Sequence, residues 1–256
     1  MMDNKNCIYP SLQGKNCILT GSNRGIGKAL LSALAKNKVN IWACARKPAD
    51  DFINYTKTLE EQYDVWIKPV YFELSDENAI KSALKEVFSE KKNIDLLINN
   101  AGILHHGLFT MAPISEIRAV FNVNVMAPII LMQSVIRKMQ RQKSGNIVNL
   151  CSIAGLDSHP GDSIYGSSKA ALASITKVAA TESAPYGIRI NAVAPGPVNT
   201  DMITDGFSSF GDDVFKNCAM QRLAAPEEIT DAILYLLSDN SSFINGQIIR
   251  IDGGTN

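Results

Sequence analysis

Short apolar runs rich in β-branched residues alternate with longer amphipathic stretches along almost the whole chain. A run of four to eight such residues predicts a strand, and apolar residues spaced three or four positions apart predict a helix. Most of the runs are apolar on both faces, which is typical of parallel strands covered by helices on both sides. The alternation therefore predicts an α/β protein with a doubly wound, Rossmann-type sheet of seven parallel strands.

The predicted elements follow one another from residue 16 to residue 251. Strands are expected at Asn16–Thr20, Val39–Ala45, Val65–Phe72, Ile94–Asn99, Asn146–Cys151, Ile188–Val193 and Gln247–Ile251. Helices are expected at Gly25–Asn37, Asp50–Gln62, Asp76–Glu90, Ile114–Gln142, Ser163–Ser183 and Pro226–Leu237. A chain of 256 residues can bury one core of this kind, so we expect a single domain over 1–256. The stretch 199–225 lacks periodicity and is expected to be a substrate-covering loop within that domain.

The charged residues balance, with 25 basic and 25 acidic side chains. This balance gives no reason to expect a nucleic acid or an anionic membrane as a partner. The N-terminal stretch is polar, and no apolar run approaches the roughly 20 residues of a membrane span. The five cysteines are scattered without metal-ligand spacing, which favours free thiols in a reducing compartment. We therefore expect a cytoplasmic protein with no disulfide, no zinc and no other metal.

A glycine-rich turn follows the first predicted strand and leads directly into the first predicted helix. It reads Thr20-Gly21-Ser22-Asn23-Arg24-Gly25-Ile26-Gly27. Glycines there allow a tight turn and a close approach to a pyrophosphate, which the N–H groups of the helix N-terminus hold. The spacing is G-x-x-x-G-x-G, and a glycine-rich turn alone is also found in ordinary strand-to-helix loops. Its place after the first strand favours dinucleotide binding.

Arg46 follows the second predicted strand, where a dinucleotide fold that selects NAD places an acidic residue on the ribose hydroxyl. A guanidinium binds phosphate through paired hydrogen bonds, so Arg46, helped by Arg24, suits a ribose 2′-phosphate. We therefore expect NADP(H) as the cofactor. A solvated arginine at a strand end is the alternative.

Tyr165 and Lys169 lie four residues apart in a predicted helix and share one face. The lysine ammonium can therefore lie beside the phenol and favour its ionised form. A Tyr-x-x-x-Lys pair alone often occurs by chance. Ser152 follows the fifth predicted strand, at the sheet edge where open α/β sheets bind ligands. Its hydroxyl can bind a substrate oxygen on which charge develops, although turn or capping serines are common at such places.

Asn124 lies inside a long predicted helix, and a buried asparagine needs hydrogen-bond partners. Pro128, four residues further on, has no N–H group to donate to the carbonyl of Asn124. We therefore expect the helix to kink there and to leave an acceptor free.

These motifs, taken in order, resemble those of the short-chain dehydrogenase/reductase family over nearly the whole chain. The shared signatures are Thr20-Gly21-x-x-x-Gly25-x-Gly27, Asn99-Asn100-Ala101-Gly102, Asn124, Ser152 with Tyr165-x-x-x-Lys169, and Pro195-Gly196-x-Val198-x-Thr200. The segments 189–196 and 246–254 are most similar to the branch that includes 3-oxoacyl-acyl-carrier-protein reductases. The resemblance implies a carbonyl reductase and a homo-oligomer, usually a tetramer.

The resemblance also implies a role for each matching residue. Tyr165 would be the general acid that protonates the carbonyl oxygen, tuned by Lys169, which would also bind the nicotinamide ribose. The main chain of Asn124 would hold a water that relays protons from the lysine. The implied cofactor-binding set is Gly21, Ser22, Arg24, Gly25, Ile26, Gly27, Arg46, Glu73, Leu74, Asn100, Ala101, Gly102, Tyr165, Lys169, Pro195, Gly196, Val198 and Thr200. Glu73 stands where many relatives carry an aspartate beside the adenine, so that contact stays open, and Asn99 is expected to tie neighbouring strands together.

The residues expected around the substrate have mixed chemistry. Met202, Ile203, Phe207, Phe210 and Phe215 suit an acyl chain or another apolar body. Asp157, His159 and Asp162 suit a polyol or sugar, or are exposed loop residues. The adjacent His105 and His106 point in different directions and have no acidic or cysteine partner at metal-ligand spacing, so substrate contact or surface exposure is expected.

The leading hypothesis is NADPH-dependent reduction of a 3-oxoacyl thioester, either a small molecule or carrier-bound. A basic cluster at the end of the long helix, Arg137, Lys138, Arg141 and Lys143, suits an acidic carrier, or is a solvated face. Tyr186 counts against a carrier, because carrier-dependent relatives often have arginine there. The alternatives are a reductase of a sugar, polyol or other small carbonyl substrate, and a non-catalytic dinucleotide-binding sensor or scaffold. The presence of all four residues Asn124, Ser152, Tyr165 and Lys169 favours an enzyme.

Overall fold

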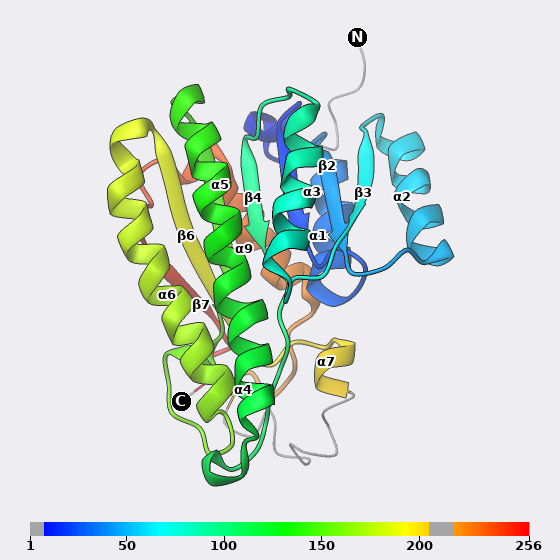
Figure 1. Ribbon diagram of the computed structural model, residues 1–256. Coiled ribbons are helices and arrows are strands. Elements are labelled where there is room, and N and C mark those ends of the chain that lie inside the picture. Colours follow the sequence, from blue (N-terminus) through cyan, green and yellow to red (C-terminus); the bar gives the residue numbers. More distant parts are fainter. Residues whose placement is uncertain (1–7, 205–217, 256) are drawn as a thin grey trace.

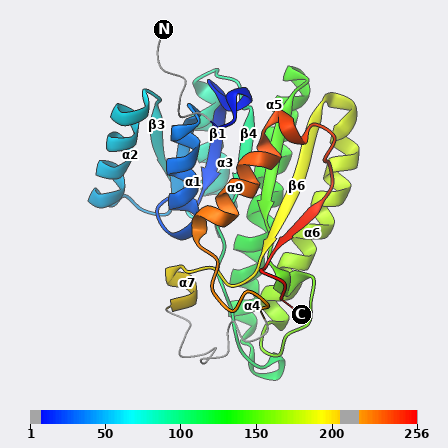
Figure 2. The same cartoon turned by 180° about the vertical axis from the view of Figure 1, so that it is seen from behind.

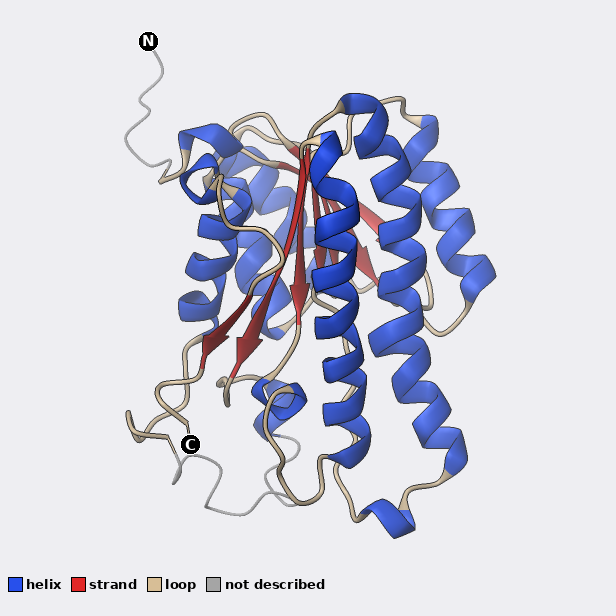
Figure 3. Ribbon diagram, turned by 90° about the vertical axis from the view of Figure 1, so that its left-hand side faces the viewer, coloured by secondary structure: helices blue, strands red, loops and turns tan. Residues whose placement is uncertain are grey.

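A parallel seven-stranded sheet forms the centre of the computed structural model, which describes residues 8–204 and 218–255. The strand order is β3-β2-β1-β4-β5-β6-β7, with helices on both faces (Figure 1, Figure 3). The strands are β1 (Asn16–Thr20), β2 (Asn40–Ala45), β3 (Ile67–Tyr71), β4 (Leu96–Asn99), β5 (Gly145–Leu150), β6 (Ile188–Pro195) and β7 (Ile248–Ile251). The predicted doubly wound fold and all seven predicted strands are confirmed.

Two apolar cores lie on opposite faces of the sheet, because successive side chains of each strand point to opposite sides. In β1, Ile18 belongs to the core under one layer of helices, and Cys17 and Leu19 belong to the other core. The first layer contains α3 (Glu77–Ser89), α5 (Ala127–Gln142) and α6 (Ser163–Ser183). The second contains α1 (Gly25–Lys36), α2 (Asp50–Tyr63) and α9 (Pro226–Leu237) (Figure 2).

Some strand boundaries differ from the predicted ones for local reasons. The predicted strand Val65–Phe72 shortens to Ile67–Tyr71, because the Trp66 N–H donates to the Asn40 side chain at 3.2 Å. Strand β6 runs two residues beyond its predicted end, to Pro195, which pairs with Ile251 of β7. These shifts leave the order and direction of the strands unchanged.

The predicted helix Ile114–Gln142 contains a π turn. Helix α4 (Ile114–Phe121) continues into a π-helical turn at Asn122–Met126 and then into α5. The Ala127 N–H donates to the carbonyl of Asn122, five residues earlier, and Pro128 has no N–H to offer to the carbonyl of Asn124. The distortion that the Asn124/Pro128 pair predicted is therefore confirmed.

The same segment, 114–142, is the one described helix whose length and composition would suit a membrane span. This corrects the expectation that no apolar stretch would approach that length. Half of its most apolar window is buried inside the protein, and Leu131, Met132 and Val135 pack in the core beside α3. Buried core helices pass the same test of length and composition.

Three of the buried polar side chains connect the sheet to α6. The Asn99 side chain at the end of β4 donates to Asn149 Oδ1 on β5 at 2.8 Å. Asn149 Nδ2 in turn donates to Thr176 Oγ1 on α6 at 2.8 Å. Asn99 therefore ties neighbouring strands together, as predicted, and the connection extends to the helix that carries Tyr165 and Lys169.

We predict that replacing Asn149 with leucine lowers the free energy of unfolding by about 2–4 kcal/mol. The Asn99 amide would lose its acceptor and the Thr176 hydroxyl its donor, both in the protein interior. Urea unfolding followed by circular dichroism measures this change. The same substitution at the exposed Asn54 of α2 is the control and should change stability by less than about 0.5 kcal/mol. Equal effects at both positions would contradict a stabilising role for the buried connection.

Candidate active site

The glycine turn between β1 and α1 packs so closely that side chains cannot fit at two of its positions. A Cβ atom on Gly27 would lie 1.9 Å from the carbonyl oxygen of Gly21. Gly21 itself has a φ of +67°, a backbone conformation that favours glycine. Arg24, the N-cap of α1, makes no side-chain capping bond, so the first N–H groups of the helix are directed toward the pocket that the turn lines. The turn has the form of an anion site at a helix N-terminus.

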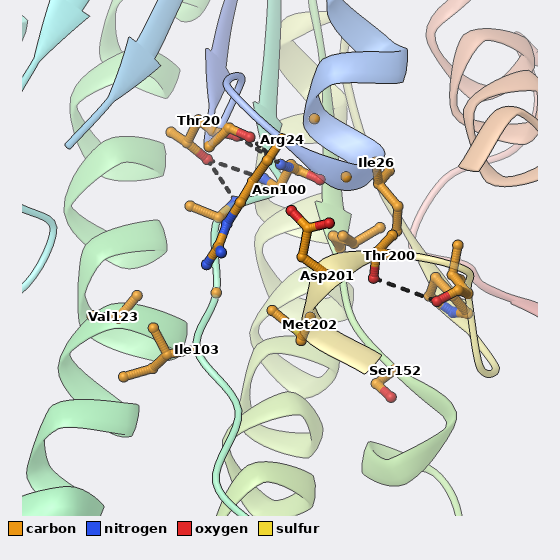
Figure 4. A pocket seen from close by; sticks show the side chains of 18 of the residues that line it. Thr20, Arg24, Ile26, Asn100, Ile103, Val123, Ser152, Thr200, Asp201 and Met202 are labelled. Atoms are coloured by element: carbon orange, nitrogen blue, oxygen red, sulfur yellow. Dashed lines mark hydrogen bonds between the residues drawn. The ribbon is translucent and has the colours of Figure 1, made fainter. Parts of the chain in front are cut away.

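Thr20 and Asn100 hold this turn against the end of β4. The Thr20 hydroxyl accepts the N–H groups of Asn100 and Ala101 at 3.0 and 3.1 Å. The Asn100 amide donates to the carbonyls of Thr20 and Gly21 at 2.9 and 3.1 Å. Figure 4 shows these bonds, with Arg24 extending from the turn and Ser152 further along the same pocket. The strand order reverses between β1 and β4, the position where open α/β sheets bind dinucleotides.

A cavity of about 910 Å³ runs along the carboxyl ends of the strands. Its volume lies at the upper end of the roughly 300–1,000 Å³ typical of ligand pockets. The predicted cofactor residues that line it are Gly21, Arg24, Gly25, Ile26, Gly27, Arg46, Glu73, Leu74, Asn100, Ala101, Gly102, Tyr165, Lys169, Pro195, Gly196, Val198 and Thr200. Ser152 lines it as well, so the structure brings the glycine turn and the Ser-Tyr-Lys cluster into one space.

Ser22 is placed differently from the prediction. Its side chain is fully buried, and its hydroxyl donates to the Cys44 carbonyl of β2 at 3.0 Å. Ser22 does not line the cavity, because its side chain fastens the turn to the neighbouring strand. The side chain has a structural role here, and cofactor binding by Ser22 stays a prediction.

Arg46 and Glu73 form an ion pair where the segments after β2 and β3 line the cavity. Arg46 Nε lies 3.3 Å from Glu73 Oε2, and both side chains are largely exposed. An exposed pair of this kind contributes little to stability. The guanidinium is therefore near the expected ribose position with a weakly held partner.

Ser152, Tyr165 and Lys169 meet where β5 ends and α6 begins. The Ser152 side chain interacts with the Tyr165 hydroxyl and acts to lower its pKa. The Lys169 ammonium is 3% exposed, donates to the Leu150 carbonyl at 2.7 Å and lies 5.7 Å from the centre of the Tyr165 ring. Ser152 also accepts the Ala154 N–H at 3.2 Å, which fixes the short turn that follows β5.

Burial controls the ionisation of this cluster. Burial raises the pKa of Tyr165 to about 12, against a smaller lowering by the Ser152 side chain. Burial likewise lowers the pKa of Lys169 to about 8. The expected lowering of the Tyr165 pKa by Lys169 is not found in this structure: burial raises the pKa of the phenol, and the ammonium donates to the Leu150 carbonyl. A tyrosine with this pKa holds its proton at neutral pH.

Asn124 acts through its side chain as well as its position in the π turn. Asn124 is fully buried, accepts the Ile103 N–H at 2.9 Å and donates to the Ile103 carbonyl at 2.9 Å. It also donates to the Ser168 hydroxyl at 3.1 Å, and Ser168 is next to Lys169. The side chain thus joins the segment after β4 to α6, and it does not line the cavity.

The substrate-side residues separate into two groups. His106, His159 and Asp162 line the cavity together with Ile103, Ile153, Met202 and Ile203. Asp157 does not line it, because Arg250 of β7 binds its carboxylate at 2.8–2.9 Å and lowers its pKa. His105 is also turned away, with Nε2 3.4 Å from Glu116. Phe207, Phe210 and Phe215 lie outside the described residues.

Several cavity residues escaped the sequence-based assignment, among them Thr20 and Thr255. Thr20 was quoted as part of the glycine motif, but its hydroxyl is the acceptor that joins β1 to the segment after β4. Thr255 lines the cavity because the C-terminal tail turns back, where Thr255 pairs with Cys218. No periodic pattern in the sequence marks such a return.

The fold and the cavity together define a class of protein: an α/β protein with a dinucleotide-type pocket that ends on a Ser-Tyr-Lys cluster. A family model described as "Enoyl-(Acyl carrier protein) reductase" matches residues 21–256. The chain is 34% identical to a 3-oxoacyl-[acyl-carrier-protein] reductase FabG of Thermotoga maritima, over 95% of this chain and 98% of the relative. It is also 34% identical to carbonyl reductase family member 4 of Xenopus tropicalis, over 94% and 97%. A solved short chain dehydrogenase/reductase family protein matches with a TM-score of 0.83 at 28% identity, over 95% of this chain and 98% of that one.

The chain belongs to the short-chain dehydrogenase/reductase family. The predicted family is therefore confirmed. Membership makes the protein an oxidoreductase of carbonyl or alcohol groups that uses a nicotinamide dinucleotide.

We predict that Lys169→Met stabilises the protein at pH 7 by about 2 kcal/mol. The lowered pKa of Lys169 corresponds to a burial cost of about 3 kcal/mol for the charged amine, and loss of the Leu150 hydrogen bond offsets about 1 kcal/mol. The folded lysine loses its proton near pH 8 and the unfolded one near 10.5, so wild-type stability rises with pH in that interval. The advantage of the variant should therefore shrink toward zero by pH 9.5. Urea unfolding at the two pH values measures this, and a less stable variant at pH 7 would contradict it.

Proposed function

We propose that this protein is an NADPH-dependent reductase that converts a ketone to a secondary alcohol, with Tyr165 as the proton donor. The observation that carries the proposal is the single cavity that contains both the glycine turn and the cluster of Ser152, Tyr165 and Lys169. The catalytic roles of these residues and of Asn124 are part of the proposal.

The residues of the cavity fit a dinucleotide. The uncapped N-terminus of α1 and the side-chain-free surface of Gly21 and Gly27 suit a pyrophosphate. The small residues Ala101 and Gly102 leave room at the middle of the cavity, where a Cβ on Gly102 would lie 3.3 Å from Lys169 Nζ. A nicotinamide bound at that end supplies the hydride of the reaction.

The protein's own residues handle the proton. Because burial keeps the Tyr165 hydroxyl protonated at neutral pH, it can donate to a carbonyl oxygen as negative charge develops there. The Ser152 hydroxyl, which interacts with Tyr165, is in place to share the same oxygen. Lys169, whose pKa of about 8 lies close to neutral pH, can return a proton to the tyrosine. The π turn at Asn124 extends this path toward solvent by offering a main-chain carbonyl to a water.

A 3-oxoacyl thioester is the proposed substrate. The relative from Thermotoga maritima is named as a 3-oxoacyl-[acyl-carrier-protein] reductase, and the apolar wall of Ile103, Ile153, Met202 and Ile203 suits an acyl chain. The thioester would be presented free or on a carrier. The basic cluster predicted as a carrier-docking face lies at the end of α5 that points away from the cavity (Figure 1), so it does not flank the entrance. We further propose a cytoplasmic homo-oligomer, a tetramer, with no nucleic-acid or membrane partner.

A sugar, polyol or other small carbonyl substrate is the second candidate. It is favoured by the polar residues His106, His159 and Asp162 in the cavity wall. NADPH oxidation measured against acyl thioesters, free ketones, quinones and keto-sugars distinguishes the two. If none of these substrates is reduced while NADPH still binds, the protein is a dinucleotide-binding sensor or scaffold instead.

We predict that Tyr165→Phe lowers kcat/KM by about 10²–10⁴-fold, the contribution typical of a positioned acid. NADPH binding, measured by fluorescence titration, should change by less than about threefold, because the ring that lines the cavity is retained. The exposed Tyr186 provides the matched control, and Tyr186→Phe should keep full activity. Turnover that survives in the Tyr165 variant would remove this residue as the proton donor.

We predict that Arg46→Ala weakens NADPH binding about 10- to 100-fold and leaves NADH binding nearly unchanged. The expected loss is that of a charge-assisted pair of hydrogen bonds to a 2′-phosphate. Arg141→Ala, an exposed arginine at the far end of α5, is the control. Fluorescence titrations of both nucleotides measure the effect, and a wild-type preference for NADH would overturn the NADP assignment.

A further inference from the structure

The substrate end of the cavity contains a histidine–carboxylate pair that the reductase chemistry described above does not use. His106 lies in the segment after β4, and Asp162 is the N-cap of α6, three residues before Tyr165. His106 Nδ1 lies 3.1 Å from Asp162 Oδ1, with side chains 24% and 17% exposed. Both residues line the cavity that contains Ser152 and Tyr165.

The backbone around the pair is shaped to admit the imidazole. The Gly107 N–H donates to the Gly161 carbonyl at 2.9 Å, which joins the two substrate-side segments. A Cβ on Gly161 would lie 2.3 Å from His106 Cε1, and Gly161 has a φ of +91°. A glycine at 161 is therefore required for the ring to occupy its place against Asp162.

The Asp162 carboxylate determines which ring nitrogen of His106 carries the proton. An ionised Asp162 only accepts hydrogen bonds, so His106 Nδ1 carries the proton and the ring orientation is set. The Nε2 atom is then an acceptor in the neutral ring and a donor in the imidazolium. His159 adds a second imidazole to the same wall, and its buried Nε2 has no hydrogen-bond partner among the described residues.

His105 shows that this placement is specific to one of two adjacent histidines. Its Nε2 faces Glu116 at 3.4 Å, and it does not line the cavity. The chain therefore places one imidazole in the cavity wall and turns its neighbour away from it.

We propose that His106, oriented by Asp162, is a specificity-determining residue that hydrogen-bonds a second oxygen of the substrate, near the reacting ketone. The substrate class is a ketone with a neighbouring oxygen function. The hydroxyl of a keto-polyol would donate to Nε2 of the neutral ring, whereas the thioester carbonyl of a 3-oxoacyl group would accept from Nε2 of the imidazolium. The apolar side chains of Ile103, Ile153 and Met202 line the same cavity, so polar and apolar parts of one molecule would each find partners there. This inference rests on the proposed reductase function and narrows its substrate.

The test compares three substrates in wild type and in His106→Gln: acetoacetyl-N-acetylcysteamine, a keto-polyol and 2-octanone, which has no second oxygen. In wild type, kcat/KM should favour one oxygenated ketone over 2-octanone by at least about tenfold. His106→Gln should lower kcat/KM for that substrate about tenfold, mainly through KM, and change 2-octanone by less than about twofold. The oxygenated substrate whose kcat/KM falls more in His106→Gln shows whether the second oxygen is that of a thioester carbonyl or that of a hydroxyl.

His105→Gln is the matched control and should retain the wild-type preference. NADPH titration and thermal unfolding of each variant establish that it is folded. If His106→Gln is too unstable to assay, Asp162→Asn is measured instead. The loss of kcat/KM for the oxygenated ketone is divided by the loss for 2-octanone, so an effect on Tyr165 that all substrates share cancels in this ratio. An equal loss on all three ketones, or no wild-type preference for an oxygenated one, would overturn the inference. If no ketone at all is reduced, the proposed function itself fails instead.

Discussion

The burial of one ammonium group, that of Lys169, is the constraint around which the site is arranged. A charged amine in the protein interior is costly unless it is hydrogen-bonded. Its acceptor is the Leu150 carbonyl at the last residue of β5, where the strand ends and a carbonyl becomes available to a side chain. This single contact holds α6 against the end of the sheet. It thereby brings the phenol of Tyr165, one helical turn before Lys169, close to the end of β5.

Further bonds hold α6 in the position that this contact requires. Asn124 bonds Ser168 from the π turn, and Asn149 bonds Thr176 from β5, one on each side of Lys169 along the helix. Side chains at 169 and 176 are two turns apart and share a face, so both bonds to β5 act on the same side of the helix. The helix is therefore restrained in rotation and in translation. Catalysis requires that the reacting groups are positioned to within a few tenths of an ångström. Contacts outside the reacting groups, such as these hydrogen bonds, provide that restraint.

The sequence predicted the fold because its information is local and repeated. Apolar strands such as 94–99 and 146–151 and amphipathic helices carry their periodicity in every few residues, and the element order followed from them. The Asn124/Pro128 pair predicted a distorted helix because a missing N–H group is a local fact. The motif residues predicted the shared cavity, since the carboxyl ends of parallel strands meet at one edge. In contrast, the role of Ser22, the return of Thr255 and the pKa of Tyr165 depend on contacts between distant segments, which no local pattern encodes.

The same distinction explains why the substrate is harder to predict from the sequence than the type of reaction. The residues that we propose to move protons lie just after β5 and on α6, and repeated hydrogen bonds fix the geometry of these elements. The residues that face the substrate lie in segments without periodicity, such as 102–107 and 156–162, and their orientation follows from individual pairs. Asp157 turns to Arg250 and Asp162 turns to His106, although both carboxylates belong to one short loop. Asp162 also contributes to the raised pKa of Tyr165, because its negative charge disfavours a phenolate nearby. The group that orients the proposed specificity residue therefore also helps keep Tyr165, the proposed acid, protonated, so the proposed recognition and the proposed proton transfer depend on one carboxylate.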